Sequence, residues 1–449
     1  MAARASRGLR VAGLLALASL AAAACGAGAG GGGGGSSHTV RVAVVANPDI
    51  TQMEKLIGTF EKENPGITVK FDTLPEDQER SEIQKDISTH GGLYDVIMIS
   101  NYETPIWARN GWLDNLSTKF IASDTSYDAG DLLRPIAQSL SYKGGLYSVP
   151  FYGESSMLYY RKSMLKAAGV TLPLHPTWTQ VAAAAAKLNK PGKVAGICLR
   201  GQSGWGENLA TLDTVINTFG GSWFNTSWKP QLTSPATESA VKFYVNLVRK
   251  YGEPGASNDG FTELLTQYEQ GKCAMWYDST VAASSLSSAP AVFRDTGYAY
   301  APVEKTTSSG WLYTWSLGIP KDTASQSAAW KFVSWATSKA YLRLVGQKLG
   351  WAQVPPGSRT STYQNPHYQQ AASAFAPITL HSIDSVNQAS ATVPKVPYTG
   401  IQFVDIPQFE NLGTEVSQQI SGAIAGSESV SHALAVSQQD AGPVGQQQH

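Results

Sequence analysis

The sequence has 449 residues, of which 34 are basic and 34 acidic, so its formal net charge is zero. This balance provides none of the excess positive charge that binds nucleic-acid phosphates, and no nucleic-acid partner is expected. A chain of this length is too long for one simple hydrophobic core, which favours two lobes.

The first 24 residues have the organisation of a secretory signal. Arg4, Arg7 and Arg10 form a positive stretch without acids, and residues 11–24 are an uncharged run rich in Leu, Ala and Val. That run is too short for an ordinary transmembrane helix. The pattern predicts a signal peptide over 1–24 that is cleaved on export.

Cys25 stands directly after this signal, and the sequence AAACG around it resembles the lipobox of bacterial lipoproteins. Ala22 occupies the position where Leu is usual, and the alternative is an ordinary signal peptide with a leftover thiol. Residues 26–37 are almost entirely Gly, Ala and Ser, which cannot bury enough apolar surface to fold. We expect a lipidated Cys25 and a flexible tether over 25–37 that hold the protein on the extracytoplasmic face of the cell membrane.

Strand and helix patterns alternate through the next sixty residues. The predicted elements are a strand at 40–46, a helix over 49–63, a strand at 67–71, a helix around 83–87 and a strand at 95–99. Asp49 and Gln52 have the spacing of a capping box at the first helix, and Thr177 and Gln180 have the same spacing at the start of a later predicted helix. This βαβαβ order predicts a parallel sheet with ligand sites beyond the carboxyl ends of its strands.

The rest of the chain continues the alternation. The predicted elements are helices at 177–188, from 235 and at 261–270, strands at 194–199, 273–277, 298–300 and 316–319, and helices through 329–336, 412–425 and 430–438. The tail 439–449 is rich in Gly and Gln and is expected to be disordered. Cys198 and Cys273 lie in apolar, strand-like segments, which leaves a disulfide and two buried thiols equally open.

Six segments in order resemble the family 1 extracellular solute-binding proteins of bacterial ABC importers. They are FEKENPGITV, YDVIMIS, GWLDNLS, YSVPFYGESSMLYYRKSML, HPTWTQVAAAAAKL and GKCAMWYD, and the resemblance runs from about residue 40 to 438. A narrower resemblance, to the branch that binds sorbitol and mannitol, is seen in CLRGQSGWGENLA, VINTFGGSWF, GWAQVPPGSR and VPYTGIQFVDIP.

The resemblance implies an α/β, two-lobed periplasmic-binding-protein-like fold of type II, with parallel-sheet lobes joined by crossover hinge strands. Its topology would place 38–149 and 313–375 in the N-lobe, and 150–312 and 376–438 in the C-lobe. It also implies a monomer without cofactor that captures a small polyol by hinge closure and delivers it to the transmembrane permease subunits of an ABC importer.

A polyol presents hydroxyls on an apolar carbon chain, so its site needs polar heads beside flat aromatic faces. The candidate ligand-binding residues at predicted strand ends and crossovers are Asn47, Asp49, Tyr102, Glu103, Tyr152, Glu154, Trp205, Glu207, Asn208, Trp276, Asp278, Trp315, Trp351 and Arg359. The structural alternatives are a helix cap for Asp49, a helix start for Glu207, hinge packing for Tyr152 and core packing for each tryptophan. Arg200 could reach the cleft or hold Glu207.

Other function classes lack their motifs. There is no G-x-x-x-x-G-K-[ST] phosphate loop, and the seven histidines show no metal-ligand spacing. A secreted carbohydrate-active enzyme stays an alternative, because carboxylates such as Glu154 and Asp278 could converge in the cleft. An oligosaccharide or monosaccharide ligand is the alternative within the same family.

Overall fold

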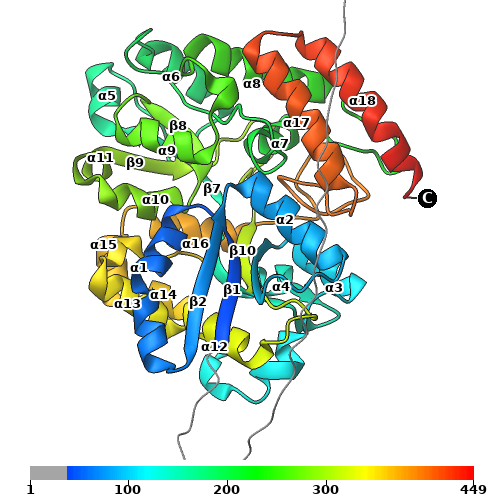
Figure 1. Ribbon diagram of the computed structural model, residues 1–449. Helices are drawn as coiled ribbons and strands as arrows, with labels where there is room; N and C mark the ends of the chain where they lie inside the picture. The colour runs from blue at the N-terminus through cyan, green and yellow to red at the C-terminus, as the bar shows by residue number, and fades with distance from the viewer. Residues whose placement is uncertain (1–37, 449) are drawn as a thin grey trace, which may run out of the picture. The chain divides into compact units, whose positions relative to one another are not determined.

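The computed structural model describes residues 38–448, so the predicted signal, Cys25 and the tether lie outside the described residues (Figure 1). The strands are β1 His38–Val45, β2 Ile67–Leu74, β3 Val96–Ser100, β4 Ser141–Tyr142, β5 Gly145–Leu146, β6 Ser148–Glu154, β7 Ser156–Arg161, β8 Met275–Ser279, β9 Thr296–Tyr300 and β10 Tyr313–Gly318. Across residues 38–448 no helix has the length and hydropathy needed to cross a membrane.

Helices occupy most of the remaining chain. The α-helices are α1 Pro48–Glu63, α2 Glu76–Ser88, α3 Glu103–Asn110, α4 Arg134–Ser139, α5 Lys162–Ala167, α6 Trp178–Leu188, α7 Asn208–Thr218, α8 Pro235–Tyr251, α9 Phe261–Glu269, α10 Ala282–Ser285, α11 Pro290–Asp295, α12 Gln326–Ala336, α13 Lys339–Lys348, α14 Thr360–Gln364, α15 Pro366–Ala371, α16 Ala376–Ser385, α17 Phe409–Ala425 and α18 Val430–Gln446. Short π or 3-10 segments lie at Ser117–Ile121, Thr125–Tyr127, Ala129–Asp131, Ala256–Asn258, Leu286–Ser288 and Trp351–Gln353.

The N-lobe is built on a five-stranded mixed sheet with the order β2-β1-β3-β10-β6. β1 pairs in parallel with β2 and β3, as the βαβαβ pattern predicts, whereas β10 is antiparallel to β3 and to β6. All five residues of β3 are buried, because helices cover both faces of a central strand in such a sheet. The carboxyl ends of β1, β2 and β3 therefore share one edge.

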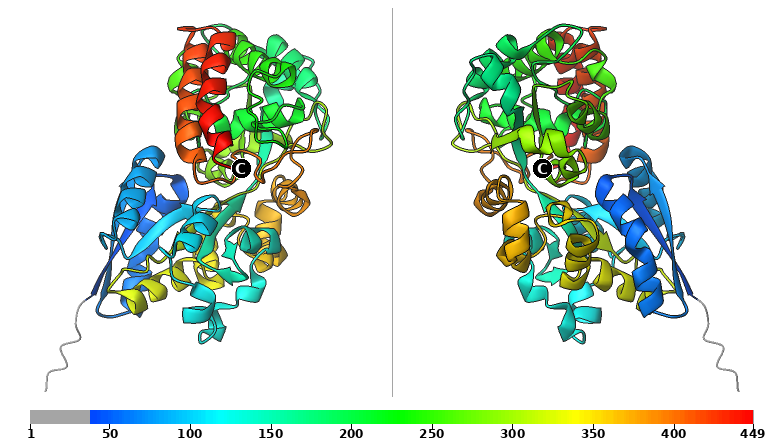
Figure 2. Two further views of the ribbon diagram at one scale, coloured as in Figure 1. Left: turned by 90° about the vertical axis from the view of Figure 1, so that its right-hand side faces the viewer. Right: turned by 90° about the vertical axis from the view of Figure 1, so that its left-hand side faces the viewer.

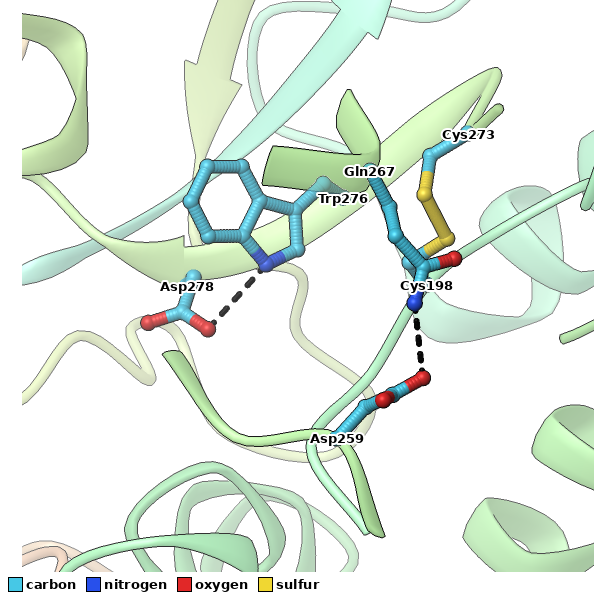
Figure 3. The surroundings of a disulfide bond; sticks show 6 residues. All are labelled: Cys198, Asp259, Gln267, Cys273, Trp276 and Asp278. Carbon is cyan, nitrogen blue, oxygen red and sulfur yellow. Dashed lines mark hydrogen bonds between the residues drawn. A yellow bond between two sulfur atoms is a disulfide. The ribbon is translucent and has the colours of Figure 1, made fainter. Parts of the chain in front are cut away.

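The C-lobe sheet has the order β8-β7-β9, and both pairings are antiparallel. The parallel pairing beside this sheet consists of isolated bridges, which join the extended segment 195–198 to Cys273 and Trp276. The expected two-lobed α/β class is confirmed, but its sheets are mixed rather than purely parallel. Cys198 and Cys273 form a disulfide that fastens this segment beside β8 (Figure 3).

Two connections join the sheets. β6 ends at Glu154 in the N-lobe sheet and β7 begins at Ser156 in the C-lobe sheet, while the chain returns between β9 and β10. The predicted lobe boundary at residue 150 is thus corrected to Ser155, because β6 stays paired with β10 as far as Glu154. Figure 2 shows the two lobes from the side, with the crossing segments between them.

The C-terminal helices α17 and α18 pack on each other and on α8 (red helices in Figure 1). The expectation of a disordered tail is wrong as far as Gln446, because α18 continues that far. Ala441 and Gly445 are buried, and a Cβ at Gly445 would lie 2.1 Å from the carbonyl oxygen of Trp228. Small residues in the tail therefore permit close packing, which the composition alone did not reveal.

The N-terminus of α1 differs from the predicted cap by two residues. Asn47 is the N-cap, and its Oδ1 accepts a hydrogen bond of 2.9 Å from the backbone N–H of Ile50. Asp49 therefore lies inside the first turn. The capping box predicted at Thr177 and Gln180 is present at the start of α6.

Candidate functional site

A cavity of about 300 Å³ lies between the two lobes. The N-lobe wall consists of Val45, Ala46, Asn47, Pro75, Glu76, Asp77, Tyr152, Glu154, Tyr313 and Trp315. The C-lobe wall consists of Arg200, Gln202, Trp205, Gly206, Glu207, Ala210, Phe261, Thr262, Glu263, Ser279, Val281, Trp311 and Gln402. A larger groove of about 1100 Å³ lies on the C-lobe, but N-lobe residues do not line it. The interlobe cavity is the candidate site, because both lobes contribute polar and aromatic groups to it.

Arg200 is the central polar residue of the C-lobe wall. Its Nε and Nη2 donate to the two carboxylate oxygens of Asp278 at 2.9 and 2.6 Å, and its Nη1 donates to the carbonyl of Gly206 at 2.9 Å. Trp276 donates its indole N–H to Asp278 at 3.1 Å (Figure 3). Such a bidentate pair fixes the plane of the guanidinium, so Arg200 presents a preorganised donor group to the cavity.

Two carboxyl groups of the wall have strongly raised pKa values. Burial raises the pKa of Glu154 to about 8, and the hydrogen bond from Ser279 Oγ and the charge of Arg200 offset this only in part. Burial likewise raises the pKa of Glu207 to about 8, against the lowering effect of Arg200, whose Nη1 lies 3.4 Å away. Near neutral pH each group therefore spends much of its time protonated, able to donate as well as accept a hydrogen bond.

Aromatic rings form the apolar part of the walls, and Arg80 of α2 links them across the lobes. Its guanidinium lies 4.3 Å from the ring centroid of Trp205 in the C-lobe and 4.7 Å from that of Trp315 in the N-lobe. Arg80 also pairs with Glu103 and, at 2.9 Å, with Glu76. Of these contacts, the one with Trp205 crosses between the lobes, whereas Trp315, Glu103 and Glu76 hold Arg80 in place within the N-lobe.

The same rim depends on Gly206. A Cβ at this position would lie 2.1 Å from Oε1 of Glu76, at the first turn of α2. The absence of a side chain allows the C-lobe backbone to approach α2, as glycine does where two chain segments meet closely.

Six of the predicted site residues lie on the cavity wall: Asn47, Tyr152, Glu154, Trp205, Glu207 and Trp315. Asn47 and Tyr152 are joined by a hydrogen bond of 3.3 Å from Nδ2 of Asn47 to the Tyr152 hydroxyl. Contact of these six with a ligand stays a prediction. Asn47 follows the end of β1, Tyr152 and Glu154 lie at the end of β6, and Trp315 lies near the start of β10. Trp205 and Glu207 reach the same wall from the segment before α7.

Four predicted residues near the cavity have other partners. Glu103 accepts from Arg80 and from the Ser100 backbone N–H at 2.9 Å. The Tyr102 hydroxyl donates to the Ile406 carbonyl at 3.0 Å, and Asn208 donates to the Ser417 carbonyl at 2.9 Å. Asp278 is occupied by Arg200. These residues support the wall rather than form it.

The remaining four predicted residues lie in the core or on distant helices. Asp49 is buried in α1, where burial raises the pKa of its carboxyl to about 7. Trp276 is fully buried and stacks on Tyr159, and Trp351 stacks on His367. Arg359 is fully buried and donates to backbone carbonyls of Thr337, Asp128 and Tyr127 at 2.8, 2.9 and 3.0 Å. Their polarity or ring size suggested a site, but their partners are structural.

Several wall residues were not among the candidates. Pro75, Glu76 and Asp77 directly follow β2, so the strand-end rule that selected Asn47 would also have found them. Phe261 and Glu263 begin α9, and Ser279 ends β8. Gln402 lies in the long segment between α16 and α17, inside the stretch VPYTGIQFVDIP that carried the polyol-branch resemblance but supplied no candidate site residue. Among residues 38–448 no cluster of His, Cys, Asp and Glu side chains is arranged to hold a metal ion.

Comparisons with known proteins agree with this architecture. The profile of the family described as bacterial extracellular solute-binding protein matches residues 47–342. The mannitol-binding protein of Pseudomonas aeruginosa is 42% identical over 407 residues, which are 90% of this chain and 92% of that protein.

Solved structures give the same result. An ABC transporter solute-binding protein from Agrobacterium vitis with bound D-mannitol has a TM-score of 0.88 and 46% identity, covering 90% of this chain and 97% of that one. A second, from Agrobacterium radiobacter in complex with ribitol, has a TM-score of 0.78 and 23% identity, covering 91% of this chain and 99% of that one. At that identity the second likeness concerns the fold alone.

Proposed function

We propose that this chain, which belongs to the bacterial extracellular solute-binding proteins, captures a small polyol for an ABC importer. The observation that carries the proposal is the 46% identity, over 90% of the chain, to a protein solved with D-mannitol. The interlobe cavity holds the polyol, and the transmembrane subunits of the importer receive it. Members of this family bind a substrate without transforming it, so no catalytic role is assigned.

The cavity wall supports a polyol ligand on chemical grounds. Arg200 offers N–H donors, while Asn47 and Gln402 carry amide groups that can donate and accept. The rings of Trp205 and Trp315 offer flat faces to the C–H surface of the carbon chain. Each buried polar group that pairs with a ligand hydroxyl makes the site more selective. A ligand without that hydroxyl would leave the group unpaired, at a cost of about 1–3 kcal/mol.

The size of the cavity supports a single small ligand. Its volume of about 300 Å³ lies at the small end of ligand sites, which span roughly 300–1,000 Å³. An oligosaccharide would need a longer groove with further ring faces. A hexitol is therefore favoured over the oligosaccharide alternative.

Hinge closure is the proposed mechanism of capture. Among residues 38–448 the chain passes between the lobes at the β6–β7 and β9–β10 connections and in the return to α16 and α17, so rotation about these segments can open the cavity. A ligand that contacts both walls favours the closed form through its differential affinity for the two states. The contact of Arg80 in the N-lobe with Trp205 in the C-lobe lies across one rim of the cavity and favours the closed form.

Isothermal titration calorimetry of the purified protein with mannitol, sorbitol, ribitol, glucose and maltose tests the function. We expect saturable one-to-one binding of a hexitol and no heat from glucose or maltose. Closure should change the tryptophan fluorescence, because Trp205, Trp311 and Trp315 line the cavity. Binding of maltose alone would replace the polyol by an oligosaccharide, and silence from a folded sample would refute the assignment.

The proposed lipid anchor at Cys25 has its own test. Cells that express the protein are labelled with a fatty-acid analogue, and the membrane fraction is compared between the natural chain and Cys25→Ser. We expect label and membrane retention only with Cys25. Equal retention of the unlabelled variant would favour the ordinary signal peptide. A monomer in solution is likewise proposed, and the molar mass from light scattering tests it.

A further inference from the structure

The wall of the interlobe cavity is rich in acids. Within residues 38–448 the wall includes five carboxyl groups and one cation, Arg200, with no lysine. The carboxyl groups belong to Glu76, Asp77, Glu154, Glu207 and Glu263. Glu76 is paired with Arg80, and Glu154 and Glu207 carry charge only as the pH approaches 8, so the wall becomes more negative than a neutral polyol needs as the pH rises.

Arg200 does not balance this excess, because its charge is already neutralised. Asp278, whose side chain is fully buried, takes two of its N–H donors at 2.6 and 2.9 Å. The nearby Arg80 is committed in the same way to Glu103 and Glu76. An anionic ligand would therefore meet carboxylates without an unpaired cation to receive it.

Two of the acids are partly compensated by the start of α9. The backbone N–H of Phe261 donates to Glu207 at 3.3 Å, and that of Gly260 donates to Glu263 at 3.1 Å. A helix N-terminus stabilises negative charge at these positions. Glu154 has no such support: its Oε2 accepts from the hydroxyl of Ser279, and no cation of the described chain pairs with it directly.

Two further groups at the wall lack hydrogen-bond partners. Gln402 is 3% exposed, and its amide N–H group donates to the Leu312 carbonyl at 3.1 Å while its Oε1 has no partner within the described chain. Trp311 is 1% exposed, and its indole N–H is unpaired among residues 38–448. Buried polar atoms without a partner are rare in proteins, so a hydroxylated ligand that reached these two would satisfy one acceptor and one donor.

We propose that the cavity selects its polyol by charge, accepting neutral hexitols and cationic amino-hexitols and excluding aldonates and polyol phosphates of the same length. The proposal rests on the proposed polyol function and narrows its substrate class. An ammonium group beside Glu154 forms a charge-assisted hydrogen bond in a dry site. A carboxylate or phosphate at the same place is repelled by the remaining acids.

Because the carboxyl groups of the wall titrate, the proposed selection by charge should depend on pH. Burial raises the pKa of Glu154 to about 8, and Arg200 lowers it while Asp278 and Glu76 raise it further. Burial likewise raises the pKa of Glu207; Arg200 lowers it, and Glu76 and Asp77 raise it further. An ammonium ligand favours the ionised carboxyl groups, so its affinity rises as the pH rises from about 6 to 8.5 while the amine, like lysine, keeps its proton.

The test is calorimetry of the whole protein with mannitol, 1-amino-1-deoxymannitol and mannonate at constant ionic strength. At pH 8 we expect the amine to bind at least as tightly as mannitol and the aldonate at least 100-fold more weakly. Between pH 6 and pH 8.5 the affinity of the amine relative to mannitol should rise at least five-fold. Heats that depend on the buffer should report the protons released at lower pH.

Two variants localise the effect. Glu154→Gln should lower the affinity ratio of amine to mannitol at least ten-fold, because it removes the acceptor charge and keeps the shape. Glu253→Gln is the matched control, since Glu253 is a buried glutamate of the C-lobe that does not line the interlobe cavity. It should leave the ratio unchanged.

The outcomes separate the two proposals. Tight mannitol binding with equal affinity for mannonate, or with no binding of the amine, overturns charge selection and leaves the polyol function standing. An unchanged ratio in Glu154→Gln also overturns it. If mannitol itself does not bind to the folded protein, the polyol function fails and charge selection falls with it.

Discussion

Each lobe buries an arginine, and the two are used in opposite ways. Arg359 of the N-lobe is fully buried and donates to three backbone carbonyls that belong to Thr337, Asp128 and Tyr127. Arg200 of the C-lobe is 6% exposed and directs its donors to a carboxylate and the Gly206 carbonyl beside the cavity.

The contrast between the two arginines bears on how a buried charge is interpreted. Both guanidinium groups are satisfied, so burial and pairing alone do not distinguish support from recognition. Arg359 joins three loops of one lobe, whereas Arg200 lines the space between two lobes. Arg200 can act on a ligand because it lines open volume, whereas Arg359 is away from that cavity and acts on stability.

The largest expected effects come from changing these two arginines. Arg200→Ala leaves Asp278 buried without its cation, and Arg359→Ala leaves carbonyls unpaired, so each should lose about 3–5 kcal/mol of unfolding free energy. Because alanine variants with such losses can fail to fold, the lysine variants are measured too. Arg200→Lys should weaken mannitol binding at least ten-fold and Arg359→Lys less than two-fold, by calorimetry below the unfolding transition. Equal losses of affinity would remove the distinction.

The disulfide tests the same contrast between stability and recognition, because both cysteines of the described chain belong to the C-lobe. Cys198 and Cys273 close a loop with a sequence separation of 75, and removing such a cross-link costs about 2–4 kcal/mol. We expect the double variant with serine at both positions to unfold at a lower urea concentration. Affinity for mannitol should fall only slightly, since Arg200 keeps Asp278. A reducing agent applied to the natural protein should reproduce the shift, and no shift in either case would contradict the prediction.

Glu253 is a buried carboxyl group without a hydrogen-bond partner in the described chain. Within the described residues neither of its carboxyl oxygens has a hydrogen bond, and burial raises its pKa from 4.5 to about 8. The folded protein then binds more protons than the unfolded chain between these values, so stability falls as the pH rises through that window. Glu253→Gln should reduce the loss of stability between pH 5.5 and pH 8.5 by about 3 kcal/mol in urea unfolding, since a tenfold change in proton affinity corresponds to about 1.4 kcal/mol.

Glu63→Gln, on the exposed end of α1, serves as the control and should leave the pH dependence as it is. If the unfolding free energy falls with pH equally steeply in Glu253→Gln and in the natural protein, the pKa of Glu253 is not raised. Asp49, Glu154 and Glu207 also have raised pKa values, so part of the slope should persist in the variant.

The last pair of variants tests whether a change in the stability of the N-lobe, without a change in the cavity wall, alters the affinity for mannitol. Gly58 is exposed in α1 and a Cβ there meets nothing within 4 Å, so Gly58→Ala should stabilise the protein by about 0.5–1 kcal/mol. Gly346→Ala in α13 should destabilise it by about 1–3 kcal/mol, because its Cβ would lie 2.5 Å from the Trp351 ring. Neither should alter the affinity for mannitol. A change of affinity in Gly58→Ala would show that the site depends on N-lobe stability.

Local patterns predicted individual elements well. The alternation through residues 40–99 predicted β1, α1, β2, α2 and β3 in the right order, and the capping box of α6 was found at its residues. The prediction of a disordered tail was wrong because composition does not show that small residues such as Gly445 can pack closely against the rest of the chain. The segment 194–199 pairs only through isolated bridges, so a buried apolar run did not ensure a full strand.

Site prediction succeeded where one rule applied. Strand ends at the shared sheet edge placed Asn47 and Glu154 on the cavity wall. It failed where the same residue type has two roles that the sequence does not distinguish. Arg200 and Trp205 line the cavity, whereas Arg359 and Trp351 do not. Gln402 was missed although its segment VPYTGIQFVDIP was singled out, because it reaches the wall from a segment without regular structure, to which the strand-end rule does not apply.

The α/β class, the order of the N-lobe elements and, through the motifs, the family could all be obtained from the amino-acid sequence. These follow from hydrophobic period, capping residues and turn residues, which act over a few positions. Long-range packing set which charges face the cavity, which cysteines pair and where the chain crosses between lobes. Those outcomes depend on contacts between residues far apart in the chain, such as Tyr102 with Ile406 at a separation of 304, and no local pattern specifies them.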